Sequence, residues 1–232
     1  MITAATFTLP AHAATTAATI ESVQAGRLRE LPHAQKLWQT AIYKETLDGP
    51  VGVDRFGIVG DEHSGEHIDL DRAICIHPSA HYDFWRAYFR RDIPLGFFGE
   101  NLTVGAIVDE HVCVGDVVRC GSVVLQVTQP RTPCYKQARK LGVSEFVKLI
   151  LQTGRLGFLA RVIEPGFLEA GDRFELVARP HPQANLVFLN RARYAEDESE
   201  AAECAQIAAL ADDWRTAFSA CVAKKRLVTR PV

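Results

Sequence analysis

Residues 117–136 read VVRCGSVVLQVTQPRTPCYK, and this stretch decides the fold that the sequence predicts. Val117–Cys120 and Val123–Val127 are rich in Val and flank Gly121-Ser122, which is typical of two strands joined by a tight hairpin turn. The two prolines that follow restrict the backbone, so the chain should leave the sheet along a rigid path. Cys134 is then delivered at the start of a short helix.

Other short runs, separated by Gly-Asp turns, indicate further strands on both sides of this hairpin. Many short Val-rich strands favour a mainly β fold with some α, in which the sheet closes into a barrel and hides its edges. The other strands expected are Ala73–His77, Val112–Val114 and Phe174–Val177. The helices expected are Ser79–Arg90, Tyr135–Leu141, and Ser144–Thr153 with Ser144 as its N-cap.

Changes in composition divide the chain into three parts. Residues 1–19 are rich in Ala and Thr and lack Lys and Arg, so we expect a disordered leader rather than a signal peptide. Residues 20–180 form the β-barrel domain. Arg179–Pro182 contains two prolines and is expected to be a linker. Residues 186–232 have helical spacing and form a C-terminal three-helix region, with helices expected at Leu189–Ala195, Glu198–Leu210 and Asp213–Lys225.

The overall composition excludes several classes of protein. Hydrophobic residues make up 47% and charged residues 23%, which are globular proportions and not those of a disordered, collagen-like or coiled-coil chain. The net charge of −2 argues against nonspecific nucleic-acid binding, which needs a basic surface. No apolar run approaches the roughly 18 residues of a membrane span, so no membrane partner is expected. The six cysteines form no CxxC pair and favour a reduced, cytoplasmic protein.

The strongest candidate for chemistry is Cys134. A helix N-terminus offers free N–H groups and partial positive charge, which favour a thiolate. Residues 130–142 add four cations and no acid, namely Arg131, Lys136, Arg139 and Lys140. A thiolate beside fixed cations can act as a nucleophile, or it can bind a soft metal next to an anionic ligand. The alternative is a buried structural cysteine next to a solvated basic helix.

Three further features are weaker on their own. The polar run Gly60–His67 has histidines four residues apart, as do His77 and His81, which on a helix could bind zinc. Glycines in the run favour a solvated loop or the wall of a ligand pocket instead. Asn101 can hold a turn, and Lys44 ends an early strand. The GxGxxG, GxxxxGK[ST] and GxSxG signatures of nucleotide-binding and hydrolase folds are absent.

Taken in their order along the chain, the stretches discussed above and several others resemble the MOSC family, which is named after the C-terminal domain of molybdenum cofactor sulfurases. Two matching stretches are specific, Phe98–Leu102 and Gln129–Cys134. The helical tail is similar to the three-helix extension of the bacterial YiiM-type branch. The other matching stretches are Ser22–Arg27, Thr40–Lys44, Gly60–His63, Asp71–Ala73, Val114–Asp116, Pro165-Gly166 and Ala170–Asp172.

The resemblance implies a MOSC-type β-barrel that binds the molybdenum cofactor, a molybdopterin, in a basic pocket. It makes Cys134 the thiolate ligand of molybdenum and a catalytic residue, with Asp61 and His63 on the substrate side. The expected cofactor-binding residues are Lys44, Arg72, Asn101, Arg131 and Lys136. The implied reaction is the two-electron reduction of N-hydroxylated compounds such as hydroxylaminopurines, as in detoxification of N-hydroxylated bases.

One departure from the family and several alternatives stay open. His67–Leu70 replaces the His-Gly-Gly-Pro of this branch, so two glycines are lost and Asp69 adds a negative charge near Arg72. A noncatalytic molybdopterin or sulfur carrier that uses Cys134, or a domain that has lost the cofactor, are the alternatives. Because the chain has no flavin, haem or iron–sulfur signature, a separate electron-donating reductase is the expected partner. The sequence indicates no oligomeric state, and a homodimer is simply the commonest arrangement among soluble oligomers.

Overall fold

The computed structural model describes residues 17–33, 36–62, 69–195 and 197–228. Most of the expected leader therefore lies outside the described residues, although Thr19 is already the first residue of a strand. The strands are β1 (Thr19–Gly26), β2 (Arg29–His33), β3 (Lys36–Thr40), β4 (Lys44–Leu47), β5 (Val51–Asp54), β6 (Gly57–Ile58), β7 (Ile74–Pro78), β8 (Leu102–Gly105), β9 (Val117–Cys120), β10 (Val123–Pro130), β11 (Phe158–Glu164), β12 (Gly166–Leu168) and β13 (Phe174–Ala178). The helices are α1 (Ala80–Phe89), α2 (Tyr135–Leu141), α3 (Phe146–Thr153), α4 (Leu186–Ala195), α5 (Glu198–Ala205) and α6 (Asp212–Val228).

Eight strands form the main sheet, in the order β13-β9-β10-β11-β7-β8-β1-β4. The pairs are antiparallel except for β7 and β8. The start of β1 also meets the start of β13: Thr19 pairs with Arg173, and the Ile20 N–H donates to the Asp172 carbonyl at 2.9 Å. The sheet therefore closes on itself, as the expected barrel requires.

The predicted hairpin of β9 and β10 is confirmed, with Val123 opposite Cys120. The structure corrects one expected strand. Val112–Val114 is not a strand of the sheet, because Cys113 makes only an isolated bridge to Asn185 at the start of the helical tail.

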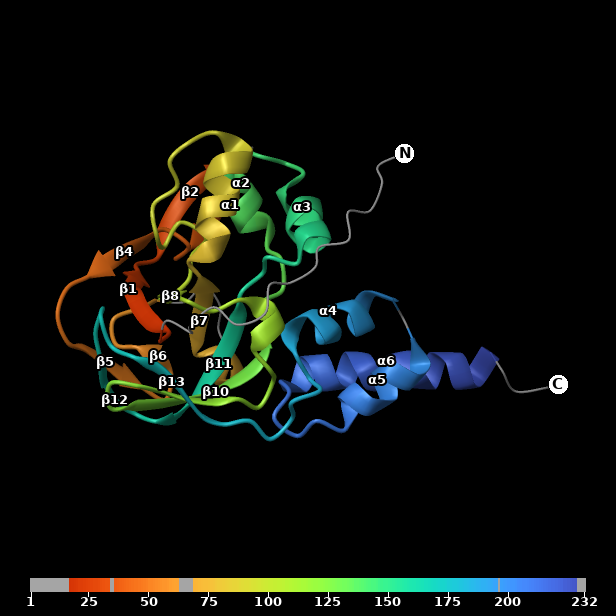
Figure 1. The fold of residues 1–232 in the computed structure, drawn as a ribbon. Helices are drawn as coiled ribbons and strands as arrows, with labels where there is room; N and C mark the ends of the chain where they lie inside the picture. Colours follow the sequence, from red (N-terminus) through yellow and green to blue (C-terminus); the bar gives the residue numbers. More distant parts are fainter. Residues whose placement is uncertain (1–16, 34–35, 63–68, 196, 229–232) are drawn as a thin grey trace.

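Three helices lie together at one end of the barrel, at the top of Figure 1, and α4, α5 and α6 pack at another side. The upper helices α1, α2 and α3 enclose a separate aromatic cluster that includes Tyr82, Trp85, Phe98 and Phe146. The tail helices instead share the core of the barrel. Leu189, Trp214 and Phe218 belong to the same buried cluster as the strand residues.

The expected linker is held in place by ion pairing and hydrogen bonds. Arg179 donates to both carboxylate oxygens of Asp116, at 2.8 and 2.7 Å, and to the His111 carbonyl. The pKa of Arg179 is raised by this bonding. The tail also bonds to the end of β10, since the Ala211 N–H donates to the Thr128 carbonyl. The strand that leads to the Cys134 loop is therefore in direct contact with the tail.

Several expected helix boundaries were wrong. α4 begins at Leu186, three residues before the expected start, and α6 ends at Val228, three residues after the expected end. The helix expected to end at Leu210 ends at Ala205, and the chain continues in turns that bury Ile207 and Leu210. Ser144 does not cap α3, which begins at Phe146 after an N-cap residue without a side-chain bond. Among the described residues, no helix is both long and apolar enough to cross a membrane.

Candidate functional site

Cys134 occupies the N-cap position of α2, as the sequence predicts. Its sulfur accepts a hydrogen bond from the Lys136 N–H at 3.4 Å, and its own N–H donates to the Gln137 side-chain oxygen at 3.3 Å. This reciprocal pair is a capping box with cysteine in place of the usual Ser or Thr. The Arg131 N–H bonds to the Gly157 carbonyl at 3.0 Å, which ties down the other end of the loop. The thiol is thus fixed by backbone bonds and remains half-buried.

A cavity of about 180 Å³ opens beside the Cys134 thiol. It brings together four residues predicted for the site, Lys44, Arg131, Cys134 and Lys136. The remaining lining residues are Thr40, Ala41, Ile42, Glu62 and Gly99. Three of the four predicted residues are cations and one further lining residue, Glu62, is an acid, so the cavity beside the thiol has an excess of cationic side chains.

Lys44 is held in this cavity by a buried ion pair. Its ammonium lies 2.6 Å from Oδ2 of Asp61, and the two side chains are only 6% and 1% exposed. Asp61 also accepts from the Gly26 N–H at 2.6 Å and from Nδ2 of Asn101 at 2.7 Å. Lys44 begins β4, whereas we expected it to end a strand. Asp61 and Asn101 therefore lie behind Lys44 and fix its position, and neither lines the cavity.

Asn101 also connects the site to the sheet. Its Oδ1 accepts from the Cys75 N–H at 3.0 Å. Gly99, two residues earlier, has φ +81°, and a Cβ there would lie 2.6 Å from Ile42. Only glycine lets the Phe98–Leu102 segment come this close to the Ile42 segment.

Among the described residues, one terminal nitrogen of the Arg131 guanidinium has a hydrogen-bond partner and the other has none. Its Nη2 donates to the Phe98 carbonyl at 2.8 Å, and Gln137 donates to the same oxygen at 3.1 Å. Its Nη1 is buried and has no hydrogen-bond partner in the part of the chain that the structure describes. A buried unpaired donor is costly, so this atom is suited to an acceptor on a bound group.

The other two cations of the predicted basic segment have different surroundings. Lys140 donates to the Ile42 carbonyl at 3.1 Å, and burial lowers its pKa to about 8. The guanidinium of Arg139 lies over the rings of Tyr135 and Trp38, at 4.7 and 5.2 Å. The segment is therefore not simply a solvated helix face.

Two more titratable groups lie below the site. Burial raises the pKa of the Cys75 thiol, an effect that the nearby Arg131 opposes. Burial lowers the pKa of His77 well below its usual value, and the charges of His81 and Arg131 add to this. The Leu156 carbonyl lies near enough to act on this pKa, but neither ring nitrogen has a partner in hydrogen-bonding geometry among the described residues.

The structure does not bring every predicted residue to the cavity. Arg72 forms ion pairs with Asp69, at 3.1 Å, and with Asp213 of α6, so it joins the barrel to the tail. Asp69, which replaces a family glycine, also caps the turn Leu70–Arg72. His63, His67 and Ile68 lie outside the described residues.

No group of His, Cys, Asp or Glu in the described ranges could by itself hold a metal. The sequence reasoning missed Gln137. Glu62 belongs to the run Gly60–His67, for which the wall of a ligand pocket was one expectation, and it lines the cavity. The Cys-x-x-Gln spacing of the capping box was the available signal for Gln137.

A closed barrel with a cysteine at the end of a strand-to-helix loop is the arrangement expected of a MOSC domain. The MOSC domain model matches residues 60–175, and this chain belongs to the MOSC domain family.

Among individual relatives, the chain is similar to protein YflK of Bacillus subtilis, with 37% identity over 85% of this chain and 91% of that protein. A protein named "Reductase" from Gibberella moniliformis is 35% identical over 80% of this chain but only 34% of its own length. The crystal structure of YiiM from Geobacillus stearothermophilus superposes with a TM-score of 0.76 and 31% identity, over 88% of this chain and 99% of that one.

Proposed function

We propose that this chain is an oxidoreductase that binds the molybdenum cofactor and reduces N-hydroxylated compounds, with Cys134 as the thiolate ligand of molybdenum. One observation carries the proposal: the Cys134 thiol and three cationic side chains, Arg131 among them, line the same cavity. Membership of the MOSC family supports it, because MOSC domains are generally associated with this cofactor.

The donor set fits such a cofactor. A thiolate is a soft ligand of the kind that binds thiophilic metals. The organic part of the cofactor bears a phosphate, and a guanidinium such as that of Arg131 binds phosphate well. Lys44 and Lys136 add positive charge to the same cavity. Arg131, Lys44 and Lys136 would hold the anionic group, and Cys134 would bind the metal.

When bound, the molybdenum centre supplies the two-electron redox chemistry that cleaves the N–O bond. The chain itself contributes position and charge. Asp61 and Asn101 fix the Lys44 ammonium at the wall of the cavity. The capping box with Gln137 fixes the direction of the Cys134 sulfur. Such supporting contacts orient a metal ligand and tune its properties.

The reaction consumes two electrons and two protons and releases the amine and water, so an external donor is needed. We propose a separate reductase partner for this role. The Gibberella moniliformis relative named "Reductase" supports it, because most of that protein lies outside the segment that matches this chain.

The decisive test is the molybdenum content of the purified protein, measured by elemental mass spectrometry after expression in a host that makes molybdopterin. We expect near-equimolar molybdenum in the wild type, and its loss in Cys134→Ala and Cys134→Ser. Cys221→Ser, which alters a half-buried thiol of α6, is the matched control and should retain the metal. Equal molybdenum in the Cys134 variants would refute the ligand assignment.

A second candidate is a carrier that holds molybdopterin or sulfur on Cys134 without turnover. The half-buried thiol in an open cavity is the observation that favours it. Reduction of an N-hydroxylated purine by the molybdenum-loaded protein with an artificial electron donor would exclude the carrier. Turnover with NADH alone would contradict the separate reductase.

A further inference from the structure

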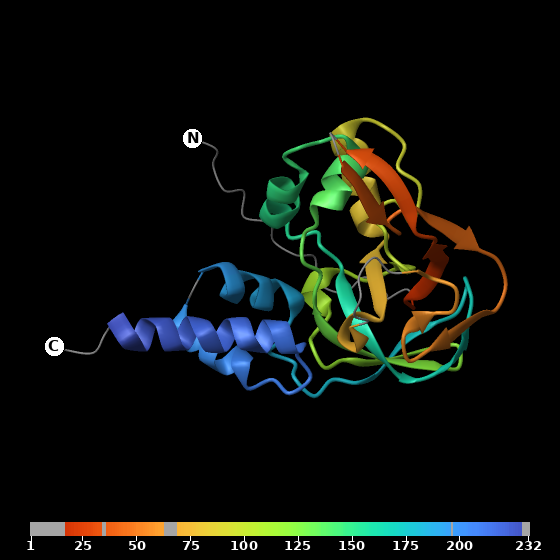
Figure 2. The ribbon, with the colours of Figure 1, turned by 180° about the vertical axis from the view of Figure 1, so that it is seen from behind.

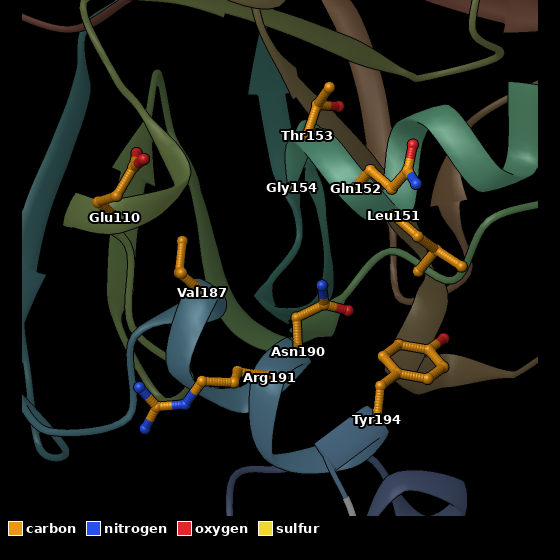
Figure 3. Close-up of a pocket in the computed structure, with 9 residues that line it drawn as sticks. All are labelled: Glu110, Leu151, Gln152, Thr153, Gly154, Val187, Asn190, Arg191 and Tyr194. Atoms are coloured by element: carbon orange, nitrogen blue, oxygen red, sulfur yellow. The ribbon is translucent and has the colours of Figure 1, made fainter. Parts of the chain in front are cut away.

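A second hollow lies where α3, α4 and the turn Asp109–His111 meet. Figure 3 shows this pocket, which has a volume of about 600 Å³. Leu151, Val187 and Tyr194 give it an apolar wall, and Asn190 points into it from α4. It shares no lining residue with the Cys134 cavity.

A smaller cavity of about 140 Å³ lies beside this pocket, and Glu110, Thr153 and Gly154 line both. His81 and Asp109 line the smaller cavity and are 5% and 4% exposed. We call the two spaces the outer pocket and the inner cavity.

The inner cavity contains a buried pair with unused hydrogen-bonding capacity. Nε2 of His81 lies 2.7 Å from Oδ2 of Asp109. Nδ1 of His81 and Oδ1 of Asp109 have no partner in the ranges that the structure describes. A buried carboxylate oxygen without a donor is costly, so a donor from a ligand would relieve it.

The charges around the inner cavity favour a cationic group. Asp109 and Glu110 are two carboxylates, and Arg155 is the lining guanidinium. Arg155 already donates to the Thr153 carbonyl at 3.2 Å and stacks on the Phe84 ring at 3.9 Å.

In the outer pocket, Arg191 is the lining cation, and it points away from the pocket toward its ion-pair partner Glu200. The carboxylates therefore lack a full complement of positive charge.

We propose that the outer pocket and the inner cavity form one binding site for an organic cation with an amidinium or primary ammonium head and an apolar body. The head donates to Oδ1 of Asp109. The body lies against Leu151, Val187 and Tyr194. This inference is independent of the function of the Cys134 cavity.

The test is calorimetric titration of the full chain with benzamidine, an amidinium on an aromatic ring. Benzoate, which has the same ring and a negative head, is the control ligand. We expect benzamidine to bind and benzoate not to bind. Loss of a hydrogen bond to a charged group is expected to raise the Kd about tenfold or more in Asp109→Asn.

Two variants of exposed side chains keep the test valid if Asp109→Asn fails to fold. Glu110→Gln and Tyr194→Ala should each weaken benzamidine binding by about fivefold or more. Glu203→Gln, at an exposed acid of α5, should bind as the wild type does. Benzoate binding as tightly as benzamidine, no benzamidine binding at about 10 mM, or unchanged affinity in both variants would overturn the proposal.

Discussion

Replacing Asp61 by Asn removes the negative charge that holds the buried ammonium of Lys44. The two side chains are 6% and 1% exposed, so water cannot replace the lost partner. Removing one member of a buried ion pair typically costs about 3–5 kcal/mol. For a chain of this size, this corresponds to a fall in Tm of roughly 6–20 °C. Asn keeps the shape of the side chain, and its oxygen can still accept from the Gly26 N–H.

The free energy of unfolding is measured by urea titration with circular dichroism. Glu45→Gln is the matched control, because its ion pair with Arg29 is largely exposed and should contribute less than about 1 kcal/mol. Lys44→Met added to Asp61→Asn removes the stranded charge and should restore part of the loss. A loss below about 1 kcal/mol in Asp61→Asn, or no recovery in the double variant, would refute this reasoning.

Three other predictions concern stability and thiol chemistry. Burial lowers the pKa of Lys140 from 10.5 to about 8, so between these pH values the unfolded chain binds more protons than the folded chain. The free energy of unfolding should therefore rise with pH in this range, and urea titrations should show a smaller rise in Lys140→Met than in the wild type. Gly157→Ala should lower the free energy of unfolding by about 2 kcal/mol or more, because φ is +72° and a Cβ would lie 2.5 Å from a backbone oxygen. Gly154→Ala has φ +67° but open space around the Cβ, so it should cost about 1 kcal/mol. Equal losses of Tm in the two variants would contradict the steric argument. Iodoacetamide followed by peptide mass spectrometry should label Cys134 and Cys221 first, since burial raises the pKa of the thiols of Cys75, Cys113, Cys120 and Cys204.

Local patterns predicted the parts of the fold that depend on near neighbours. The hairpin of β9 and β10 and the helix α2 follow from Val-rich runs, a tight turn and the Gly142 C-cap. The helix expected over Glu198–Leu210 was too long because Ile207 and Leu210 keep helical spacing while lying in turns. Both side chains are buried in the core that the barrel shares with the tail, and this burial, not a helix, explains their spacing.

The site could be predicted only in part. Lys44, Arg131 and Lys136 were expected near Cys134 and do line its cavity. The pairing of Lys44 with Asp61 joins distant parts of the chain, and no local pattern indicates it.

Arg72 could not be placed from sequence for the same reason. Its bond to Asp213 forms only because α6 packs beside the barrel. The positions of the Cys75 thiol and of His77 relative to the site likewise depend on which strands are neighbours in the sheet, and no local pattern gives that order.

The closure of the sheet has a consequence for the order of folding. β4 and β8 pair with β1 early, but Thr19 also pairs with Arg173, which is synthesised about 150 residues later. Contacts of such high sequence separation form slowly, because a long loop must be closed before they contribute. Until then the start of one edge of β1, which β4 does not cover, is unpaired and can join a strand of another chain. This short stretch of edge therefore stays open to aggregation until β13 is complete.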